Sequence, residues 1–235
     1  MAAKHRGRPS LFITLRRWLL ILIFYPIIRT VFRVTVIGRQ NVPARGPYVV
    51  AYNHISKLEP PLMLAFWPVF LEAVAGADVW DRSGQGLLVW AYDAIPVKRG
   101  EYDRAVLDRI QTVLEAGCPL AISPEGGRSH TPGMRRALPG VAYILDRAGQ
   151  IPIVPIALEG TSDEILSRAF SLPLPRPQVT LKIGAPFTLP PITGKGDERR
   201  TARQANADEV MLRIAEMLPP EYYGVYADQM AARKR

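Results

Sequence analysis

From residue 32 onward, the chain alternates short apolar runs with longer segments whose apolar residues recur every three or four positions. That helical spacing is clearest at Val106, Leu107, Ile110, Val113 and Leu114. We predict helices at 60–67, 84–92, 102–116, 135–148, 162–170 and 199–218. Strands are predicted at 32–38, 47–52, 69–75, 93–98, 119–123, 152–158 and 178–184. Such alternation is typical of an α/β domain, so we expect a mixed, largely parallel sheet flanked by helices.

The first 31 residues have a different pattern. An uncharged apolar run of eleven residues, Trp18–Ile28, lies between arginines. A helix that crosses a bilayer needs about 20 such residues, so the run favours an interfacial or re-entrant helix. Trp18 and Tyr25 suit the headgroup region, and arginines suit anionic lipid. We expect residues 1–31 to form a membrane-anchoring helical segment and 32–235 to form one domain; the alternative is a helix packed on that domain.

The positive charge is concentrated at the N-terminus. The net charge is +9, and residues 1–58 hold ten Lys or Arg and no acid. A charge beside an apolar run, with a nearly neutral remainder, argues against a nucleic-acid partner and for membrane lipids. The single Cys118 excludes an intramolecular disulfide and suits a reducing compartment. We expect the protein at the cytoplasmic face of the inner (plasma) membrane. A non-catalytic, basic membrane-surface binding protein remains an alternative.

A histidine and a carboxylate lie between the strand 47–52 and the helix predicted to follow it. His54 precedes Glu59 by five residues, and Pro60 and Pro61 suit the first turn of a helix. Because a residue before proline avoids the right-handed helical region, we expect Glu59 just outside the helix, at its positive end. A carboxylate on one imidazole nitrogen leaves the other free as a general base. The alternative is a loop histidine beside a helix-capping glutamate.

Polar residues also follow three other predicted strands. They are Lys98-Arg99-Gly100, Glu125-Gly126-Gly127-Arg128 and Glu159-Gly160. In open α/β sheets, ligands bind beyond the carboxyl ends of strands, so these loops are predicted to share one site with His54. Guanidinium groups bind phosphate bidentately, and glycines allow close approach of the backbone. Solvated basic residues and a plain glycine-rich turn are the alternatives. No Cys/His metal spacing is present in the sequence, so we expect no metal.

Together these segments resemble the 1-acylglycerol-3-phosphate acyltransferase family of glycerolipid acyltransferases. Asn53-His54 followed by Glu59 is similar to that family's Asn-His, four residues, then an acid. The other similar segments are Ile95–Gly100, Ser123–Ser129 and Val154–Gly160, and the likeness covers about residues 33–185. The resemblance implies acyl transfer from acyl-CoA or acyl-carrier protein, as cosubstrate and without a resident cofactor, to a lysophospholipid. The first candidate acceptor is 1-acylglycerol-3-phosphate, which would give phosphatidic acid.

The resemblance also implies roles for individual residues. His54 would be the base and Glu59 its orienter. Arg99 and Arg128 would contact phosphate, with Lys98 beside them, and Glu125, Gly126 and Gly127 would belong to the acceptor site. Two positions depart from the family, which usually has Asp at Glu59 and Thr at Gly127. An acyl thioesterase that uses the same His–Glu pair on water is the alternative enzyme.

Overall fold

All seven predicted strands are present and form a single sheet. The computed structural model describes residues 7–98, 101, 103–149, 151–173 and 175–233. Across the sheet the order is β1-β7-β6-β2-β5-β3-β4. Neighbouring strands from β6 to β4 are parallel, β7 is antiparallel to β6, and β1 is parallel to β7, which confirms the mixed, largely parallel sheet. The strands are β1 (Arg33–Ile37), β2 (Val49–Tyr52), β3 (Glu72–Gly76), β4 (Ile95–Val97), β5 (Leu120–Ile122), β6 (Ile153–Glu159) and β7 (Gln178–Ile183).

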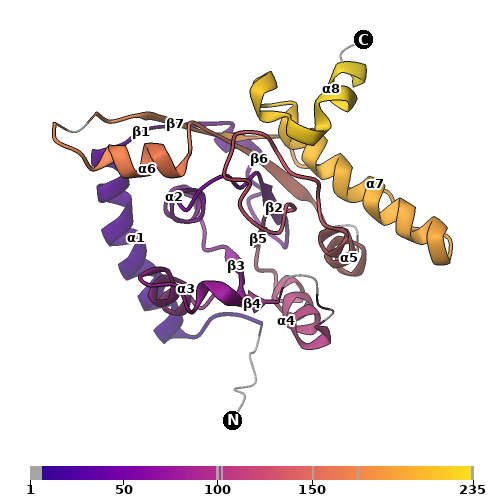
Figure 1. Ribbon diagram of the computed structural model, residues 1–235. Helices are drawn as coiled ribbons and strands as arrows, with labels where there is room; N and C mark the ends of the chain where they lie inside the picture. The colour runs from indigo at the N-terminus through magenta and orange to yellow at the C-terminus, as the bar shows by residue number, and fades with distance from the viewer. Residues whose placement is uncertain (1–6, 99–100, 102, 150, 174, 234–235) are drawn as a thin grey trace.

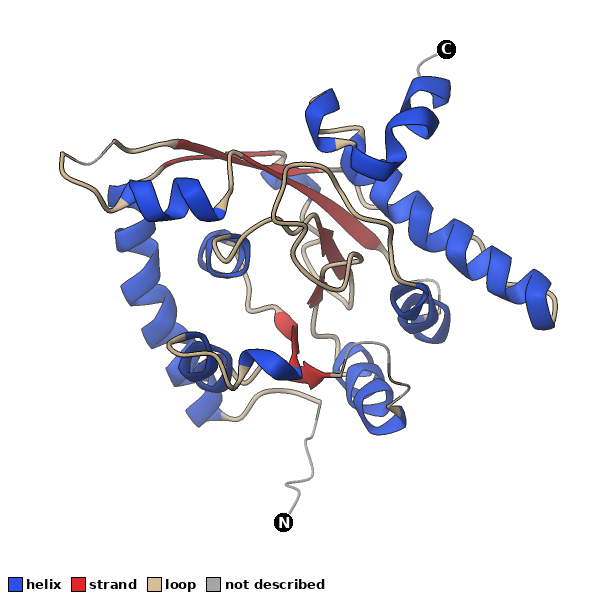
Figure 2. Cartoon of the chain, in the orientation of Figure 1, coloured by secondary structure: helices blue, strands red, loops and turns tan. Residues whose placement is uncertain are grey.

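Helices cover both faces of the sheet (Figures 1 and 2). The six predicted helices are confirmed, although the one expected at 135–148 begins only at Pro139. A short C-terminal helix was not predicted, because its seven residues show little apolar periodicity. The helices are α1 (Leu11–Val31), α2 (Glu59–Phe66), α3 (Gln85–Tyr92), α4 (Arg104–Glu115), α5 (Pro139–Ala148), α6 (Asp163–Ala169), α7 (Gly196–Ala215) and α8 (Ala227–Arg233).

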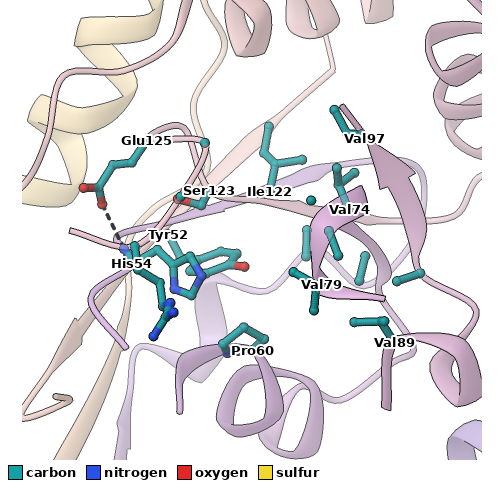
Figure 3. Close-up of a pocket in the computed structure, with 18 of the residues that line it drawn as sticks. Tyr52, His54, Pro60, Val74, Val79, Val89, Val97, Ile122, Ser123 and Glu125 are labelled. Atoms are coloured by element: carbon teal, nitrogen blue, oxygen red, sulfur yellow. Dashed lines mark hydrogen bonds between the residues drawn. The ribbon is translucent and has the colours of Figure 1, made fainter. Parts of the chain in front are cut away.

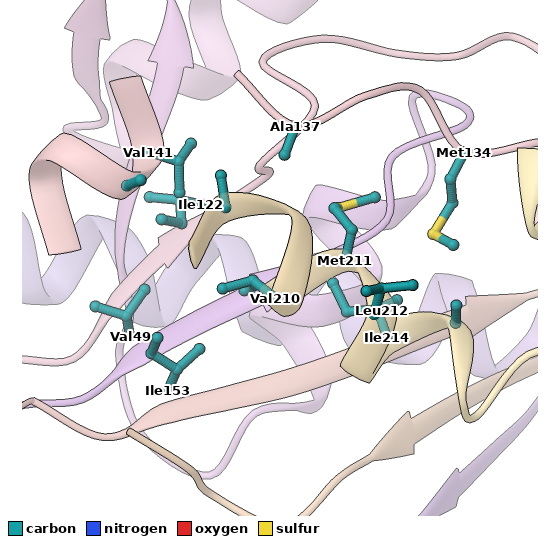
Figure 4. Close-up of a cluster of buried hydrophobic side chains, with 14 of the residues drawn as sticks. Val49, Ile122, Met134, Ala137, Val141, Ile153, Val210, Met211, Leu212 and Ile214 are labelled. Atoms are coloured by element: carbon teal, nitrogen blue, oxygen red, sulfur yellow. The ribbon is translucent and has the colours of Figure 1, made fainter. Parts of the chain in front are cut away.

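The core consists of two apolar layers, one on each face of the sheet. Alternate residues of β2 belong to different layers, because side chains of a strand point to opposite faces. Val49 belongs to a cluster with residues of α4, α5 and α7, and Figure 4 shows it with Val141 of α5 and Val210 of α7. Val50 belongs to the other cluster, with residues of α1 and α2. Burial on both faces explains why the central strands are continuous apolar runs in the sequence.

The chain connections diverge between β2 and β5. From β2 the chain passes through α2, on one face, to β3, which lies beyond β5. From β5 it passes through α5, on the other face, to β6, which lies beyond β2. In an open α/β sheet, such a divergence leaves a crevice at the carboxyl ends of the two strands. The segments that contain His54 and Glu125 follow β2 and β5, so both lie at this crevice.

Helix α1 packs along the domain beside α2 and α3, at the left of Figure 1. The helix extends beyond the apolar run Trp18–Ile28 at both ends, and it includes Arg17. Arg17 is fully buried and forms a bidentate ion pair with Glu72, with N–O distances of 2.5 and 2.9 Å. Its Nε donates to the carbonyl of Tyr92 at 2.8 Å. The inward face of α1 is therefore fixed to the domain by a buried charge pair.

The outward face of α1 is apolar and, in the described part of the chain, exposed. Its exposed side chains include Leu11, Phe12, Leu15, Trp18, Leu19 and Leu22. Of the helices in the described ranges, α1 is the one that is long and apolar enough to cross a membrane, by length and composition. A helix that is apolar on all sides is typical of a buried or lipid-facing position. Because the outward face is not buried, these residues fit contact with lipid.

Candidate active site

Most of the predicted site residues line one cavity of about 1040 Å³ at the carboxyl ends of the strands. His54, Lys98 and the segment Glu125–Arg128 all contribute to its wall. Figure 3 shows His54 and Glu125 at one side of the cavity and Val74, Val79, Val89 and Val97 at the other. Arg99 lies outside the described residues. Glu159, from the fourth loop, instead forms an ion pair with Lys182 at 2.8 Å.

The predicted contact between His54 and Glu59 is present. His54 Nδ1 lies 2.9 Å from Glu59 Oε2, and Glu59 is fully buried. The Glu59 carboxylate also accepts from Ser56 N, 2.9 and 2.8 Å from its two oxygens, and from Ser56 Oγ at 3.0 Å. Since an ionised carboxylate only accepts hydrogen bonds, this network assigns the imidazole proton to Nδ1. The other nitrogen, Nε2, then carries the lone pair, on a side chain that lines the cavity.

One detail of the prediction was wrong. Glu59 is the first residue of α2 and does not lie outside it. The helix begins there because Leu58 already has helical angles (φ −78°, ψ −33°) and its carbonyl accepts from Leu62 N at 3.0 Å. The missing N–H groups of Pro60 and Pro61 fall in the first turn, where N–H groups have no partner within the helix. Glu59 still lies in the first turn, where the helix dipole favours a negative charge.

Asn53 fixes the position of the histidine from the other side. Its amide exchanges two hydrogen bonds with the backbone of Leu158 in β6, at 2.9 and 2.8 Å. Asn53 is fully buried. The carbonyl of His54 accepts from Ser129 N at 2.8 Å, which joins the loop after β2 to the loop after β5. The asparagine of the Asn-His pair therefore has a structural role, and the backbone of His54 is held from two directions.

Glu125 also holds the loop that contains His54. Its side chain is almost fully buried and accepts from the backbone N–H groups of His54 and Arg135, both at 2.8 Å. Burial raises the pKa of Glu125 from 4.5 to about 7, and these two hydrogen bonds oppose the rise. Although Glu125 was predicted to belong to the acceptor site, both of its carboxylate oxygens have backbone partners. Its contacts are those of a residue that positions His54.

The first glycine after Glu125 is required by the backbone. Gly126 has a positive φ of 64°. A Cβ at this position would lie 2.2 Å from Leu138 Cδ1, far inside van der Waals contact. Gly126 N donates to the carbonyl of Ser123 at 3.1 Å, which closes the turn. The turn brings Gly127 and Arg128 to the cavity wall.

The two described basic residues of the predicted phosphate site differ in environment. Arg128 Nη1 lies 2.8 Å from Asp163 Oδ2, and the Arg128 side chain is 15% exposed. Asp163 Oδ1 in turn accepts from Lys57 N at 3.1 Å. Lys98 is 65% exposed and lies 3.6 Å from Glu101. Arg128 is thus held in place beside the histidine loop, whereas Lys98 lies in an open position.

Comparison with known proteins gives the family. The Acyltransferase family model matches residues 33–159, more than half of the chain. The chain belongs to the Acyltransferase family. Over 134 residues it is 30% identical to 1-acyl-sn-glycerol-3-phosphate acyltransferase alpha of Ovis aries and of Homo sapiens, a match that covers 56% of this chain and 46% and 47% of theirs. The chain therefore spans about half the length of the curated relatives it matches.

A solved structure supports the fold. The 1-acyl-sn-glycerophosphate (LPA) acyltransferase PlsC of Thermotoga maritima superposes with a TM-score of 0.53 over 88% of this chain and 99% of that chain, at 18% identity. The resemblance found in the four sequence segments is confirmed at the level of the family.

Two residues of the site were missed from the sequence. Ser56 completes the carboxylate network, and its position three residues before Glu59 has the Ser-x-x-Glu spacing in which the acid reaches back to the serine N–H. That spacing was a usable signal. Asp163 is 35 residues from its partner Arg128, and no local pattern predicts the contact.

Proposed function

We propose that this protein transfers an acyl group from an acyl thioester to the free hydroxyl of a lysophospholipid, with 1-acylglycerol-3-phosphate as the acceptor and phosphatidic acid as the product. The observation that carries the proposal is the His54–Glu59 pair at the wall of the cavity between β2 and β5. A base in this position can deprotonate a bound hydroxyl as it attacks, and no nucleophile on the protein is needed.

The reaction follows from the tautomer of His54. Nε2 takes the proton of the acceptor hydroxyl as its oxygen attacks the thioester carbonyl, and Glu59 stabilises the imidazolium that forms. The carbon–oxygen bond forms and the carbon–sulfur bond breaks. The proton then passes from Nε2 to the leaving thiolate, which restores the neutral histidine. A free thiol and a new ester are the products.

The surroundings of His54 suit both substrates. Arg128 directly precedes Ser129, whose N–H donates to the carbonyl of His54, so a phosphate close to the reacting hydroxyl can reach the Arg128 guanidinium. Apolar side chains of β3 and α3 line the cavity, among them Val74, Leu88 and Val89, and suit an acyl chain. The family resemblance adds Arg99 and Lys98 to the phosphate site.

We also infer that α1 attaches the protein to the cytoplasmic face of the inner membrane without crossing it. The pair between Arg17 and Glu72 holds the inward face of α1 on the domain. If α1 left the domain to span the bilayer, Arg17 and Glu72 would be separated and Arg17 would enter the hydrocarbon layer, at a cost of about 3 kcal/mol on insertion scales. The exposed apolar face and its flanking arginines fit a helix in the interface.

The test is a transfer assay with purified protein. Acyl-CoA and acyl-carrier protein are supplied in turn, with and without 1-acylglycerol-3-phosphate, and phosphatidic acid and free fatty acid are measured. Wild type should form phosphatidic acid, and His54→Ala should lower its turnover by about 10²-fold or more, the loss expected for a general base, without a change in thermal unfolding. Fatty acid released at the same rate with and without acceptor would instead assign a thioesterase. Near wild-type transfer by folded His54→Ala would remove the dyad from the mechanism.

A further inference from the structure

The cavity that contains His54 has two chemically different ends, on opposite faces of the sheet. At one end its wall is formed by Leu20, Ile21 and Phe24 of α1. At the other end it reaches α5 and α7, where Tyr143, Arg200 and Arg203 line it. Figure 1 shows α1 and α7 on opposite sides of the molecule, with the sheet between them. The site of chemistry therefore lies between an apolar end and a basic end.

The basic end has more positive charge than its own acids neutralise. Asp146 lies 2.8 Å from Arg199 and 3.5 Å from Arg203, so two guanidinium groups share one carboxylate. Arg203 Nε is buried and has no hydrogen-bond partner in the described part of the chain. Arg200, three residues earlier on α7, adds a third guanidinium, which lies 3.3 Å from the highly exposed Asp197. Because a buried donor without a partner costs free energy, this N–H is a position where a ligand acceptor would be favoured.

A second, smaller cavity adjoins this end. It has a volume of about 270 Å³ and is lined by Tyr143, Asp146, Arg199 and Arg203. Tyr143 and Arg203 belong to the walls of both cavities, and the Arg203 guanidinium lies 4.8 Å from the centre of the Tyr143 ring. An aromatic ring beside arginines in a concave surface is suited to a nucleotide, whose base stacks and whose phosphates accept from guanidinium.

The two substrates of the proposed reaction place their phosphates differently. In a lysophospholipid the phosphate is a few bonds from the hydroxyl that reacts, so its site must lie beside His54, where Arg128 is. In coenzyme A the phosphates are separated from the thioester by the long pantetheine arm, so their site must lie in the same cavity but away from His54. The arginines of α7 meet that condition and can bind phosphate. The side chains that α1 contributes to the cavity, Leu20, Ile21 and Phe24, are apolar and cannot.

We propose that Arg200 and Arg203, with Tyr143, bind the nucleotide phosphates of a coenzyme A thioester, so that the donor enters over α5 and α7. The inference rests on the proposed function and deepens it by naming the donor class and its site. A concave site with one partly buried arginine fits a small nucleotide better than the acidic surface of a carrier protein, which needs an open basic face.

The test compares donors with and without the nucleotide. Steady-state kinetics are measured with acyl-CoA and with the same acyl group on pantetheine at saturating acceptor, and the KM for the acceptor is measured separately at saturating donor. Arg203→Met and Arg200→Gln should each raise the KM for acyl-CoA by about tenfold, the effect of one charged hydrogen bond, and leave the KM for acyl-pantetheine and for the acceptor unchanged. Calorimetric titration with coenzyme A, which needs no turnover, should show the same loss of affinity. Arg213→Gln, on the same helix but paired with Glu209, is the control and should change neither value.

Asp146→Asn separates ligand binding from a structural role of the arginines. If Arg203 acts only through its pairing with Asp146, this variant should resemble Arg203→Met. If the arginines bind phosphate, removing the competing carboxylate should leave the KM for acyl-CoA unchanged or lower it.

Equal effects of Arg203→Met on both donors, or an effect on the acceptor alone, would overturn the assignment. Use of acyl-carrier protein but not acyl-CoA by wild type would overturn it too. No ester formation by wild type from any donor would instead refute the proposed function.

Discussion

The replacement Glu59→Gln tests the dyad with almost no change in shape. Glu59 receives hydrogen bonds from Ser56 N, Ser56 Oγ and His54 Nδ1, and all three donors are accommodated because a carboxylate only accepts. A glutamine has one accepting oxygen. The backbone N–H of Ser56 cannot move away, so that oxygen stays with it and the amide NH₂ turns toward His54. The imidazole must then present a lone pair at Nδ1 and carry its proton on Nε2, where it cannot act as a base.

The size of the effect follows from this network. To reach the active tautomer, the variant must place the Nδ1–H against the amide N–H at a separation that is 2.9 Å in wild type. It loses a hydrogen bond to a charged group, about 1.5–3 kcal/mol, and adds a comparable penalty for two opposed donors. A barrier raised by about 3–5 kcal/mol corresponds to a fall in kcat of about 10²–10⁴-fold.

The matched control is Glu59→Asp, the residue usual in the family. It keeps a carboxylate that only accepts, so the tautomer is preserved, but the shorter side chain cannot reach Ser56 and His54 equally well. We expect it to lose about tenfold in kcat, much less than Glu59→Gln. Both variants are assayed at saturating donor and acceptor, after thermal unfolding by circular dichroism has shown that they fold. A folded Glu59→Gln within about threefold of wild type would refute the reasoning and leave Glu59 as a helix N-terminal residue.

Three further predictions concern stability and membrane binding. Arg17→Met leaves Glu72 buried without its partner and should lower the free energy of unfolding in detergent by about 3–5 kcal/mol. The double variant Arg17→Met with Glu72→Leu should recover most of that loss. A loss below about 1 kcal/mol in the single variant would contradict a stabilising role of the pair. Burial raises the pKa of Glu125 from 4.5 to about 7, so between these pH values the folded protein keeps the carboxyl proton that the unfolded chain loses. The free energy of unfolding should therefore fall by about 3 kcal/mol as the pH rises from 4.5 to about 7. Glu125→Gln should have a flatter dependence in urea titrations, and an unchanged one would exclude Glu125 as its source. Leu19→Lys with Leu22→Lys, on the outward face of α1, should reduce flotation with anionic liposomes, and Thr201→Lys with Ala205→Lys should not; equal flotation of the two would place the membrane contact elsewhere.

The sequence predicted the strands well because a strand buried on both faces is a continuous apolar run. It also predicted that the loops with His54 and with Glu125 meet, since both follow strands of a parallel sheet. It could not give the order of the strands, which depends on pairings such as β1 with β7, 145 positions apart at Arg33 and Gln178. That order decides which strands border the crevice. The loops with His54 and Glu125 were therefore predicted to share the site, whereas the cavity wall formed by β3 and α3 was not predicted.

The roles of single polar residues were harder to predict than their positions. Asn53, Glu125 and Arg128 were all in segments recognised from the sequence, yet their partners are Leu158, the backbone of His54, and Asp163. Each contact joins different elements and leaves no local pattern. The same holds for Arg17 and Glu72, whose pairing makes a basic residue part of the core. A polar residue in a sequence can be assigned to a site before its contacts show whether it binds a ligand or supports the residue that does.

The two faces of α1 have different environments. Leu20, Ile21 and Phe24 line the cavity, while Leu19, Leu22 and Ile23, on the same turns, are exposed. One helix, about 10 Å across, thus separates the surface proposed to meet lipid from the space that leads to His54. Since the Arg17–Glu72 pair fixes that helix on the sheet, the fold sets the distance between the proposed lipid-facing surface and the dyad. In the proposed reaction, a lysophospholipid would bring its hydroxyl to His54 from the side of α1 while a coenzyme A thioester would enter from α7, so that the two substrates would not compete for one path.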